Sequence, residues 1–301
     1  NNMKNDLINI EWDNVKCHIC NNDDLEAISR NGEPLVNGQF GYAIHPKICK
    51  GCGLVFLSPR WSRKDYNKFY THFYDKLYRL ETKQDYGNEA VLFNIKEIWN
   101  RIKDKVDTNK HLNIMDVGCG YGFGLKYLKE QVKSASLFGI ESSPESISSL
   151  QSEDVGAKLV TDDFDSDWDK DYTEKMDLII IRHVYEHLLN PIETLKKLRK
   201  VLKPGGLIYF AVPDMVDVRT ELRDYKYWWE YIFRSVHTYY YSPMTFQKTL
   251  EIGKLYPVYM EQEKEEIWCL VGKNKNHEFK FKSMYKSQLK IFNSLFNKNE
   301  L

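Results

Sequence analysis

The sequence predicts an α/β fold in which a doubly wound, mostly parallel sheet of seven strands follows a small N-terminal module. Three observations predict it. Short apolar segments alternate with helical patterns from residue 112 onward, a glycine-dense turn follows the first of those segments, and four of the six cysteines fall within residues 1–60. Because alternation of this length is typical of parallel sheets, ligands are expected at the carboxyl ends of the strands.

The overall composition narrows the classes of partner. The chain has 301 residues, and 43 Lys and Arg balance 43 Asp and Glu, so no net charge draws it toward nucleic acid or anionic lipid. The first residues lack the profile of a signal peptide, and no apolar run approaches the length of a membrane span. A cytoplasmic location without a membrane or nucleic-acid partner is therefore expected, where cysteines serve as ligands or free thiols.

Four segments are expected along the chain. Residues 1–60 form the cysteine-containing module, and residues 61–111 have the pattern of a helical linker or lid. Residues 112–273 form the sheet domain, and residues 274–301 a C-terminal amphipathic helix that packs on the domain or on a second copy. The expected strands are 112–117, 136–140, 157–160, 176–181, 207–212, 256–261 and 265–273, of which the last two form a hairpin at the sheet edge.

Two helices of the sheet domain have recognisable starts. Ser143-Pro144 and Asn190-Pro191 each place a polar residue before proline, the arrangement typical of an N-cap and the first helical position. The second helix is expected to end at Lys203-Pro204-Gly205-Gly206, because proline and glycine interrupt its apolar pattern there.

The turn after the first expected strand is the best-defined site. It follows the pattern Asp-x-Gly-x-Gly-x-Gly, built from Asp116, Gly118, Gly120 and Gly122. Only glycine lets the backbone turn this tightly and lie close under a bound nucleoside. A dinucleotide-binding G-x-G-x-x-G pattern would need a glycine at Phe123, so that pattern is not met. The carboxylate of Asp116 favours a cationic ligand over a pyrophosphate.

The next two strand ends carry residues suited to a nucleoside. Glu141 ends the second strand, about twenty-five residues after Asp116, where a carboxylate accepts hydrogen bonds from ribose hydroxyls. The third strand leads into Asp163 and Phe164, an acceptor for an adenine amine and an aromatic ring to lie along the base. A solvated acidic loop is the alternative for Asp163 alone, but the three features in this order favour a nucleoside site.

The chain resembles class I S-adenosylmethionine (SAM)-dependent methyltransferases over residues 112 to about 273, in the segments IMDVGCGYG, FGIE, DDF, MDLIIIRHVYEHL and LRKVLKPGGLIYFAVPD. The resemblance implies a Rossmann-like sheet and SAM as the cofactor. It also implies that Asp116 and the three glycines surround the methionine part, that Glu141 binds the ribose and that Asp163 and Phe164 hold the adenine. The strand end at Arg182 and His183 is implied to line the cofactor.

The four N-terminal cysteines form two Cys-x-x-Cys pairs separated by twenty-eight residues, Cys17 with Cys20 and Cys49 with Cys52. Each pair offers two thiolates from one tight turn, and two such pairs complete a tetrahedral S4 site that favours Zn²⁺. Unrelated buried thiols are the alternative. Because four cysteines leave no open coordination position, the zinc is expected to be structural.

With the segment CKGCGLVF and the following SPR, this module resembles the N-terminal zinc domain of C-methyltransferases that act on nucleotide-linked deoxysugars. In that family the domain helps to close over the substrate. The family also has a further C-terminal domain, which has no counterpart here after the last expected strand.

Methyl transfer from a sulfonium is an in-line displacement that usually requires removal of a proton from the acceptor. The resemblance implies that His187 and the pair Val236-His237 line the sugar site. Relatives have a glutamate at the position of Val236, so its loss weakens carbon methylation and favours oxygen methylation. We expect His237 to be the base, with His187 the second candidate and a structural role its alternative. Other candidates at the strand ends are His183, Glu186 and Asp214.

The expected acceptor is a small molecule, a nucleotide-linked sugar or a related polysaccharide or secondary-metabolite precursor, methylated on oxygen or carbon by a monomer or homodimer. The aromatic residues between 225 and 246 lie where this fold usually builds its acceptor site. One alternative is an RNA- or protein-modifying methyltransferase that grips its target with the zinc module. Residues 1–60 carry six basic and seven acidic side chains, which argues against phosphate binding. Another alternative is a SAM-binding pseudoenzyme.

Overall fold

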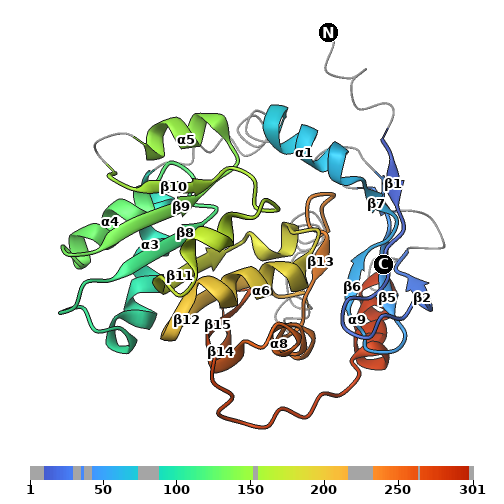
Figure 1. The fold of residues 1–301 in the computed structure, drawn as a ribbon. Helices are drawn as coiled ribbons and strands as arrows, with labels where there is room; N and C mark the ends of the chain where they lie inside the picture. Colours follow the sequence, from blue (N-terminus) through green and yellow to red (C-terminus); the bar gives the residue numbers. More distant parts are fainter. Residues whose placement is uncertain are drawn as a thin grey trace.

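The computed structural model describes residues 10–29, 35–36, 43–73, 88–151, 155–215, 233–263 and 265–297. Its larger part is a seven-stranded sheet with helices on both faces, and a smaller, largely N-terminal sheet lies beside it (Figure 1). Among the described residues, no helix is long and apolar enough to cross a membrane.

The larger sheet has the strand order β10-β9-β8-β11-β12-β15-β14. The first five of these strands are parallel, and β15 and β14 extend the sheet as an antiparallel hairpin. The predicted α/β class and the mostly parallel seven-stranded sheet are therefore confirmed. The strands are β8 Asn113–Val117, β9 Ser136–Ile140, β10 Lys158–Thr161, β11 Met176–Arg182, β12 Leu202–Pro213, β14 Tyr256–Glu263 and β15 Glu266–Gly272.

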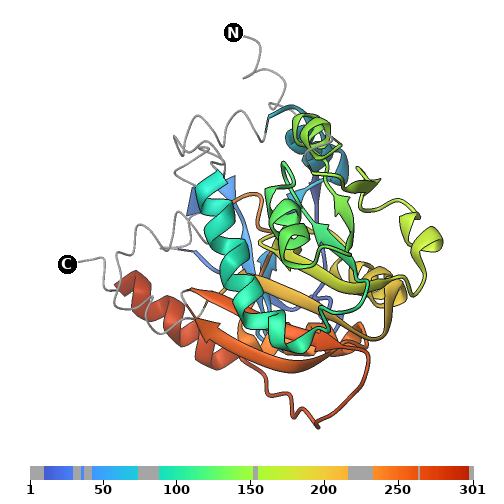
Figure 2. The same cartoon turned by 90° about the vertical axis from the view of Figure 1, so that its left-hand side faces the viewer.

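Side chains of the central strand β11 show how the helices divide between the two faces. Leu178 and Ile180 pack in one buried cluster with α3 and α4, whereas Ile179 and Ile181 pack in another with α6 and α8. Figure 2 shows α3 lying across its face of the sheet. The helices are α3 Asn88–Ile102, α4 Phe123–Gln131, α5 Pro144–Leu150, α6 Pro191–Val201 and α8 Pro243–Ile252, with 3-10 turns η1 Lys103–Lys105, η2 Trp168–Tyr172 and η3 Tyr185–His187.

Two details differ from the sequence-based expectation. Helix α6 ends at Val201 and β12 begins at Leu202, so the segment expected to stop the helix already belongs to the strand. Helix α8 was not expected, because the aromatic residues around it obscure its apolar stripe. Its start is nonetheless encoded locally: Ser242 and Thr245 form a capping box ahead of the helix.

The smaller sheet has the order β13-β6-β5-β2, and its strand β13, at residues 239–240, is far in the sequence from the other three strands. The hydroxyl of Tyr285 on α9 donates to Glu26, and Phe292 of the same helix is buried against this sheet (Figure 1). The boundary expected at residue 60 therefore separates segments that the structure packs together. The elements are β1 Trp12–Asp13, β2 Leu25–Ala27, β3 Leu35–Val36, β4 Ala43–Ile44, β5 Pro46–Cys49, β6 Val55–Leu57, β7 Arg60–Trp61, α1 Arg63–His72, β13 Tyr239–Tyr240 and α9 Tyr285–Asn297.

Candidate active site

The glycine turn connects β8 to α4, and its three glycines serve different purposes. A Cβ on Gly118 would lie 2.4 Å from Val184 Cγ2, so this glycine lets the segment after β11 pack directly on the turn. A Cβ on Gly122 would lie 2.8 Å from Val155 Cγ1. Gly120 has a φ of +52°, and no described atom lies within 4 Å of the Cβ that it lacks. Of the three, Gly120 is therefore the one that borders open space.

Glu141, directly after β9, holds this turn in place. Its Oε2 accepts a hydrogen bond from the Gly120 amide at 2.8 Å, and its Oε1 accepts from the amides of Ser142 and Ser143, both at 2.9 Å. The carboxylate that the sequence assigns to the ribose thus also fixes the turn on which a nucleoside would lie.

Asp116 is the second-last residue of β8 and is half-buried. Burial raises its pKa to about 7, and the charge of Glu141 adds to the shift. A cation beside the carboxyl would favour its ionised form. The Asp116 carboxyl lies beside α4, with its Oδ2 3.6 Å from the Cβ position of Gly124, and its contact with a cationic ligand stays a prediction.

Asp163 and Phe164 follow β10 in a turn that is braced by its own contacts. Asp163 Oδ1 accepts from the Asp165 amide at 2.9 Å, and the Phe164 ring packs against Trp168 with centroids 5.6 Å apart. These local contacts account for both side chains without a ligand, so their role toward adenine stays a prediction.

His183 directly follows β11 and has a left-handed φ of +52°, a conformation that costs free energy for a residue other than glycine. Its Nε2 lies 2.6 Å from Glu266 Oε1 on β15, and Arg182 forms an ion pair with the same carboxylate. Burial opposes ionisation of Glu266, but the hydrogen bond and charges of His183 and Arg182 outweigh it and lower its pKa to about 2. The His183 ring is thus directed to β15, and its contact with the cofactor stays a prediction.

Glu186, His187 and His237 form a buried cluster beside this strand end. Their potential ligand atoms all lie within 4.8 Å of one another, and the two imidazole rings meet edge to face with centroids 4.8 Å apart. His187 Nδ1 lies 2.9 Å from the Tyr70 hydroxyl of α1, and its Nε2 lies 3.7 Å from Glu186 Oε1. The structure therefore brings together the two histidines that the sequence nominated.

Burial dominates the electrostatics of this cluster. Burial raises the pKa of Glu186 to about 8. Burial also lowers the pKa of His187 to about 3, and the charges of His183 and Arg234 lower it further. The His187 imidazole is therefore neutral at pH 7, and its low pKa makes it a weak base in the free protein.

Thr238 explains why two distant segments meet here. Its side chain is fully buried, and its amide and hydroxyl both donate to the backbone oxygen of Glu186, at 2.9 and 3.0 Å. These bonds fix the chain around His237 against η3, which carries His187. The sequence reasoning missed Thr238 and Tyr70, because neither belongs to a motif and both act through segments that only the fold brings together.

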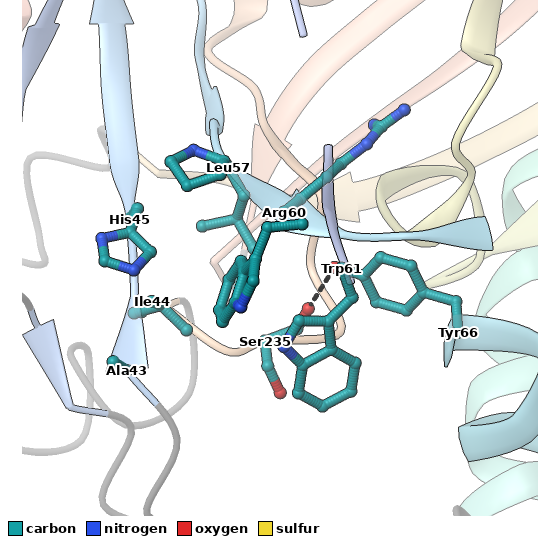
Figure 3. Close-up of a pocket in the computed structure, with 10 residues that line it drawn as sticks. Ala43, Ile44, His45, Leu57, Arg60, Trp61, Tyr66 and Ser235 are labelled. Carbon is teal, nitrogen blue, oxygen red and sulfur yellow. Dashed lines mark hydrogen bonds between the residues drawn. The ribbon is translucent and has the colours of Figure 1, made fainter. Parts of the chain in front are cut away.

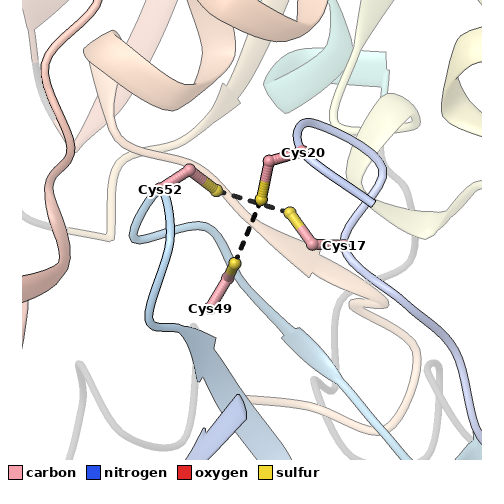
Figure 4. Close-up of side chains that lie close together, drawn as sticks. All are labelled: Cys17, Cys20, Cys49 and Cys52. Carbon is pink, nitrogen blue, oxygen red and sulfur yellow. Dashed lines mark hydrogen bonds between the residues drawn. The ribbon is translucent and has the colours of Figure 1, made fainter. Parts of the chain in front are cut away.

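The four cysteines converge as expected (Figure 4). The Sγ atoms of Cys17 and Cys52 lie 3.4 Å apart, as do those of Cys20 and Cys49, and all four lie within 4.8 Å of one another. A tetrahedron with Zn–S bonds of about 2.3 Å has S···S distances of about 3.8 Å, so the donor set fits zinc with small adjustments. Cys119 and Cys269 are buried elsewhere.

A small pocket at the edge of the N-terminal strands is a different feature (Figure 3). It has no room even for a water molecule, so it is too small to hold a ligand. The Tyr66 hydroxyl donates to the Ser235 backbone oxygen across it at 2.8 Å. The lining residues are Trp12, Ala43, Ile44, His45, Leu57, Pro59, Arg60, Trp61, Tyr66 and Ser235, so it contains none of the residues assigned to cofactor or chemistry.

The aromatic stretch predicted to line the acceptor site is only partly described. Residues 216–232, which include five of its aromatic residues, lie outside the described residues. Phe233 and Tyr239–Tyr241 are buried in hydrophobic clusters, where they pack the smaller sheet against the larger domain. These four aromatic residues therefore pack the interior and do not line an open site.

Comparison with known proteins gives the family. A family model that describes a methyltransferase domain matches residues 80–251. The ubiquinone biosynthesis O-methyltransferase of Histophilus somni (strain 2336) is 24% identical over 103 residues, which are 33% of this chain and 43% of that protein, so the match spans less than half of the relative.

Among solved structures, the PH0226 protein from Pyrococcus horikoshii OT3 matches with a TM-score of 0.46 and 17% identity, over 70% of this chain and 99% of that one. A complex of the Haloferax volcanii Trm112 methyltransferase activator with a methyltransferase matches with a TM-score of 0.43 and 16% identity, over 62% of this chain and 97% of that one. The methyltransferase-domain model covers more than half of the chain, and the chain therefore belongs to this family.

Proposed function

We propose that this enzyme methylates an oxygen of a small molecule, a nucleotide-linked sugar or a related precursor, held against the His187–His237 pair. The observation that carries the proposal is the convergence of these rings, 4.8 Å apart, at the end of a strand adjacent to β8. Gly118 of the cofactor turn packs on Val184, three residues before His187, so cofactor turn and histidine pair are neighbours.

The choice of oxygen rests on two supports. The relative from Histophilus somni is by name an O-methyltransferase. In addition, Val236 stands where the nucleotide-sugar C-methyltransferases that the chain resembles carry a glutamate, which removes one acid–base group from the demanding deprotonation of carbon. A hydroxyl needs only general-base assistance, worth about 10²–10⁴-fold.

The proposed roles follow from position. When bound, SAM supplies an electrophilic methyl group on its sulfonium. Asp116 pairs with its cationic methionine part, Gly120 leaves space for it, and Glu141 binds the ribose while Asp163 and Phe164 hold the adenine. His237, with His187 as the second candidate, takes the proton of the acceptor hydroxyl. The zinc at the four cysteines is structural and fixes the smaller sheet.

The test is transfer of an isotope-labelled methyl group from SAM to a panel of acceptors. The panel contains nucleotide sugars, small phenols, bulk RNA and a protein extract, with product identified by mass spectrometry. Label in a small-molecule hydroxyl is the expected result. Label only in RNA or protein would overturn the proposed acceptor class, and SAM binding without any transfer would identify a pseudoenzyme.

A further inference from the structure

We propose that Glu186, His187 and His237 bind a divalent transition-metal ion, in a second metal site separate from the four cysteines. The ion's role toward the acceptor rests on the proposed function, with one change: when the ion is bound, His237 is a ligand and the ion, in place of His237 as a base, promotes loss of the acceptor's proton. Metal binding itself rests only on the three side chains and is measured independently of activity.

The first argument is the state of the Glu186 carboxyl group. The side chain is 1% exposed, and neither carboxyl oxygen has a hydrogen-bond partner among the described residues. A carboxylate buried without partners is unfavourable unless another group compensates its charge or it takes up a proton. The nearest cationic side chain of β11, Arg182, is already paired with Glu266. A cation at the cluster would satisfy both oxygens.

The second argument is the geometry of the donors. Two metal bonds of about 2.0–2.2 Å allow ligand atoms to lie up to about 4.3 Å apart. The Glu186 and His187 donors are 3.7 Å apart, and the whole set lies within 4.8 Å. Around one tetrahedral ion the donors would lie about 3.4 Å apart. The Glu186–His187 pair is already close to this separation, and side-chain movements of up to about an ångström would bring all three donors onto one ion.

The third argument is the support around His187. Its Nδ1 is engaged by the Tyr70 hydroxyl at 2.9 Å, which leaves Nε2 on the side of Glu186. Metal-binding histidines typically use their second nitrogen in this way, because the outer hydrogen bond fixes the ring and its tautomer. Thr238 holds the two ligand segments together through the Glu186 backbone oxygen.

Two imidazoles and one carboxylate suit Zn²⁺, Fe²⁺, Co²⁺ or Mn²⁺. Three protein ligands leave coordination positions open, as in catalytic sites and unlike the S4 site. An acceptor hydroxyl in an open position loses its proton to water more readily, because the ion stabilises the oxygen anion. That oxygen then forms the bond to the methyl carbon, the C–S bond breaks, and S-adenosylhomocysteine leaves. An acceptor with two neighbouring hydroxyls would fill two positions.

The experiment titrates Co²⁺ into the full-length protein after treatment with a mild chelator, which leaves tightly bound zinc at the four cysteines. The wild type should bind one equivalent of Co²⁺ with weak visible bands and no sulfur charge-transfer band. Glu186→Gln, which keeps the side-chain shape, should weaken Co²⁺ binding by about 10²-fold or more, and Tyr70→Phe by about 10–100-fold. Asp169→Asn, which changes a buried carboxyl of η2 that is paired with Lys200 outside the cluster, should bind Co²⁺ like the wild type.

Two results would overturn the inference: no Co²⁺ bound at this site by the wild type, or equal binding by Glu186→Gln. The proposed function fails separately. Co²⁺ binding without methyl transfer to any small molecule would leave the metal site standing and remove the acceptor class. Methyl transfer to a small molecule by protein that lacks the second metal would leave the acceptor class standing, remove the metal from the reaction and leave His237 as the base.

Discussion

His18, which lies between Cys17 and Cys20 in the sequence, is hydrogen-bonded to Thr249 of α8, with 2.9 Å between Nε2 and Oγ1. The Thr249 hydroxyl donates to the Thr245 backbone oxygen at 2.8 Å, so Oγ1 accepts from His18 and the imidazole proton sits on Nε2. Burial lowers the pKa of His18 to about 3, and the charge of Arg60 adds to this, so the ring is neutral at pH 7. This hydrogen bond therefore joins the Cys17–Cys20 segment to helix α8 of the larger domain.

This contact should appear as a coupling energy between His18 and Thr249. A double-mutant cycle with His18→Ala and Thr249→Val, followed by urea denaturation, should give a coupling of about 1 kcal/mol, because both atoms are buried. Thr194→Val on α6, another buried threonine, should show no coupling to His18→Ala. If the effects of His18→Ala and Thr249→Val on the free energy of unfolding are additive, the Cys17–Cys20 segment and α8 are energetically independent.

Gly120→Val should reduce SAM affinity by about 10²-fold or more, equivalent to roughly 2.8 kcal/mol, because the side chain would occupy the open space beside the turn. Gly205→Val is the matched control: Gly205 also has a positive φ, +78°, with no described atom within 4 Å of a Cβ. Both variants place a branched side chain at a positive φ, so both melting temperatures should fall. Calorimetry should show lost SAM binding in the first variant alone, and unchanged affinity there would refute the cofactor assignment.

SAM binding should depend on pH through Asp116. Its pKa of about 7 in the free protein lies above the ordinary value, so below pH 7 the carboxyl is protonated and binding a cation must displace that proton. The affinity should therefore fall as the pH is lowered from 7.5 to 6, by at most tenfold per unit. Asp116→Asn should bind more weakly and lose this slope. An unchanged pH profile in the asparagine variant would assign the titration to another group.

Much of the fold is encoded in local pattern, because most strands of the larger sheet contain a short apolar run that is flanked by turn or cap residues. Helix α8 was not predictable from local pattern, because the aromatic residues near it are equally compatible with a pocket, a strand or a helix. The placement of β13 and α9 on the N-terminal sheet depends on long-range contacts such as Tyr285 with Glu26, which no local pattern records.

The candidate site divides in the same way. Cys-x-x-Cys spacing and the glycine pattern are contiguous motifs, so their residues were found from sequence. Glu186 was visible only as one acid among several, since its significance lies in burial without a hydrogen-bond partner among the described residues. The contribution of Tyr70 depends on α1 packing against η3, which is a property of the tertiary structure.

One zinc ion per chain should bind at the four cysteines. Cys52→Ser should lose that zinc and destabilise the smaller sheet, because such sites supply on the order of 10 kcal/mol in zinc peptides. Cys269→Ser replaces a buried thiol outside the site and should retain the metal. Metal analysis with thermal denaturation makes the comparison. A Cys52→Ser protein with wild-type melting temperature and no zinc would show that the fold does not need the ion.

The most demanding prediction concerns the histidine pair. His237→Gln and His187→Gln should each lower turnover by about 10²-fold or more, since both rings face one cluster at the strand end, while SAM affinity stays nearly intact. His72→Gln, at the exposed end of α1, is the control and should keep full activity. Steady-state kinetics should place the loss in kcat, because the contact matters when the acceptor's proton leaves. If both cluster variants retain wild-type turnover, proton removal belongs to another group, and the buried carboxyl of Asp214, now held by Gln262 at 2.6 Å, is the next residue to substitute.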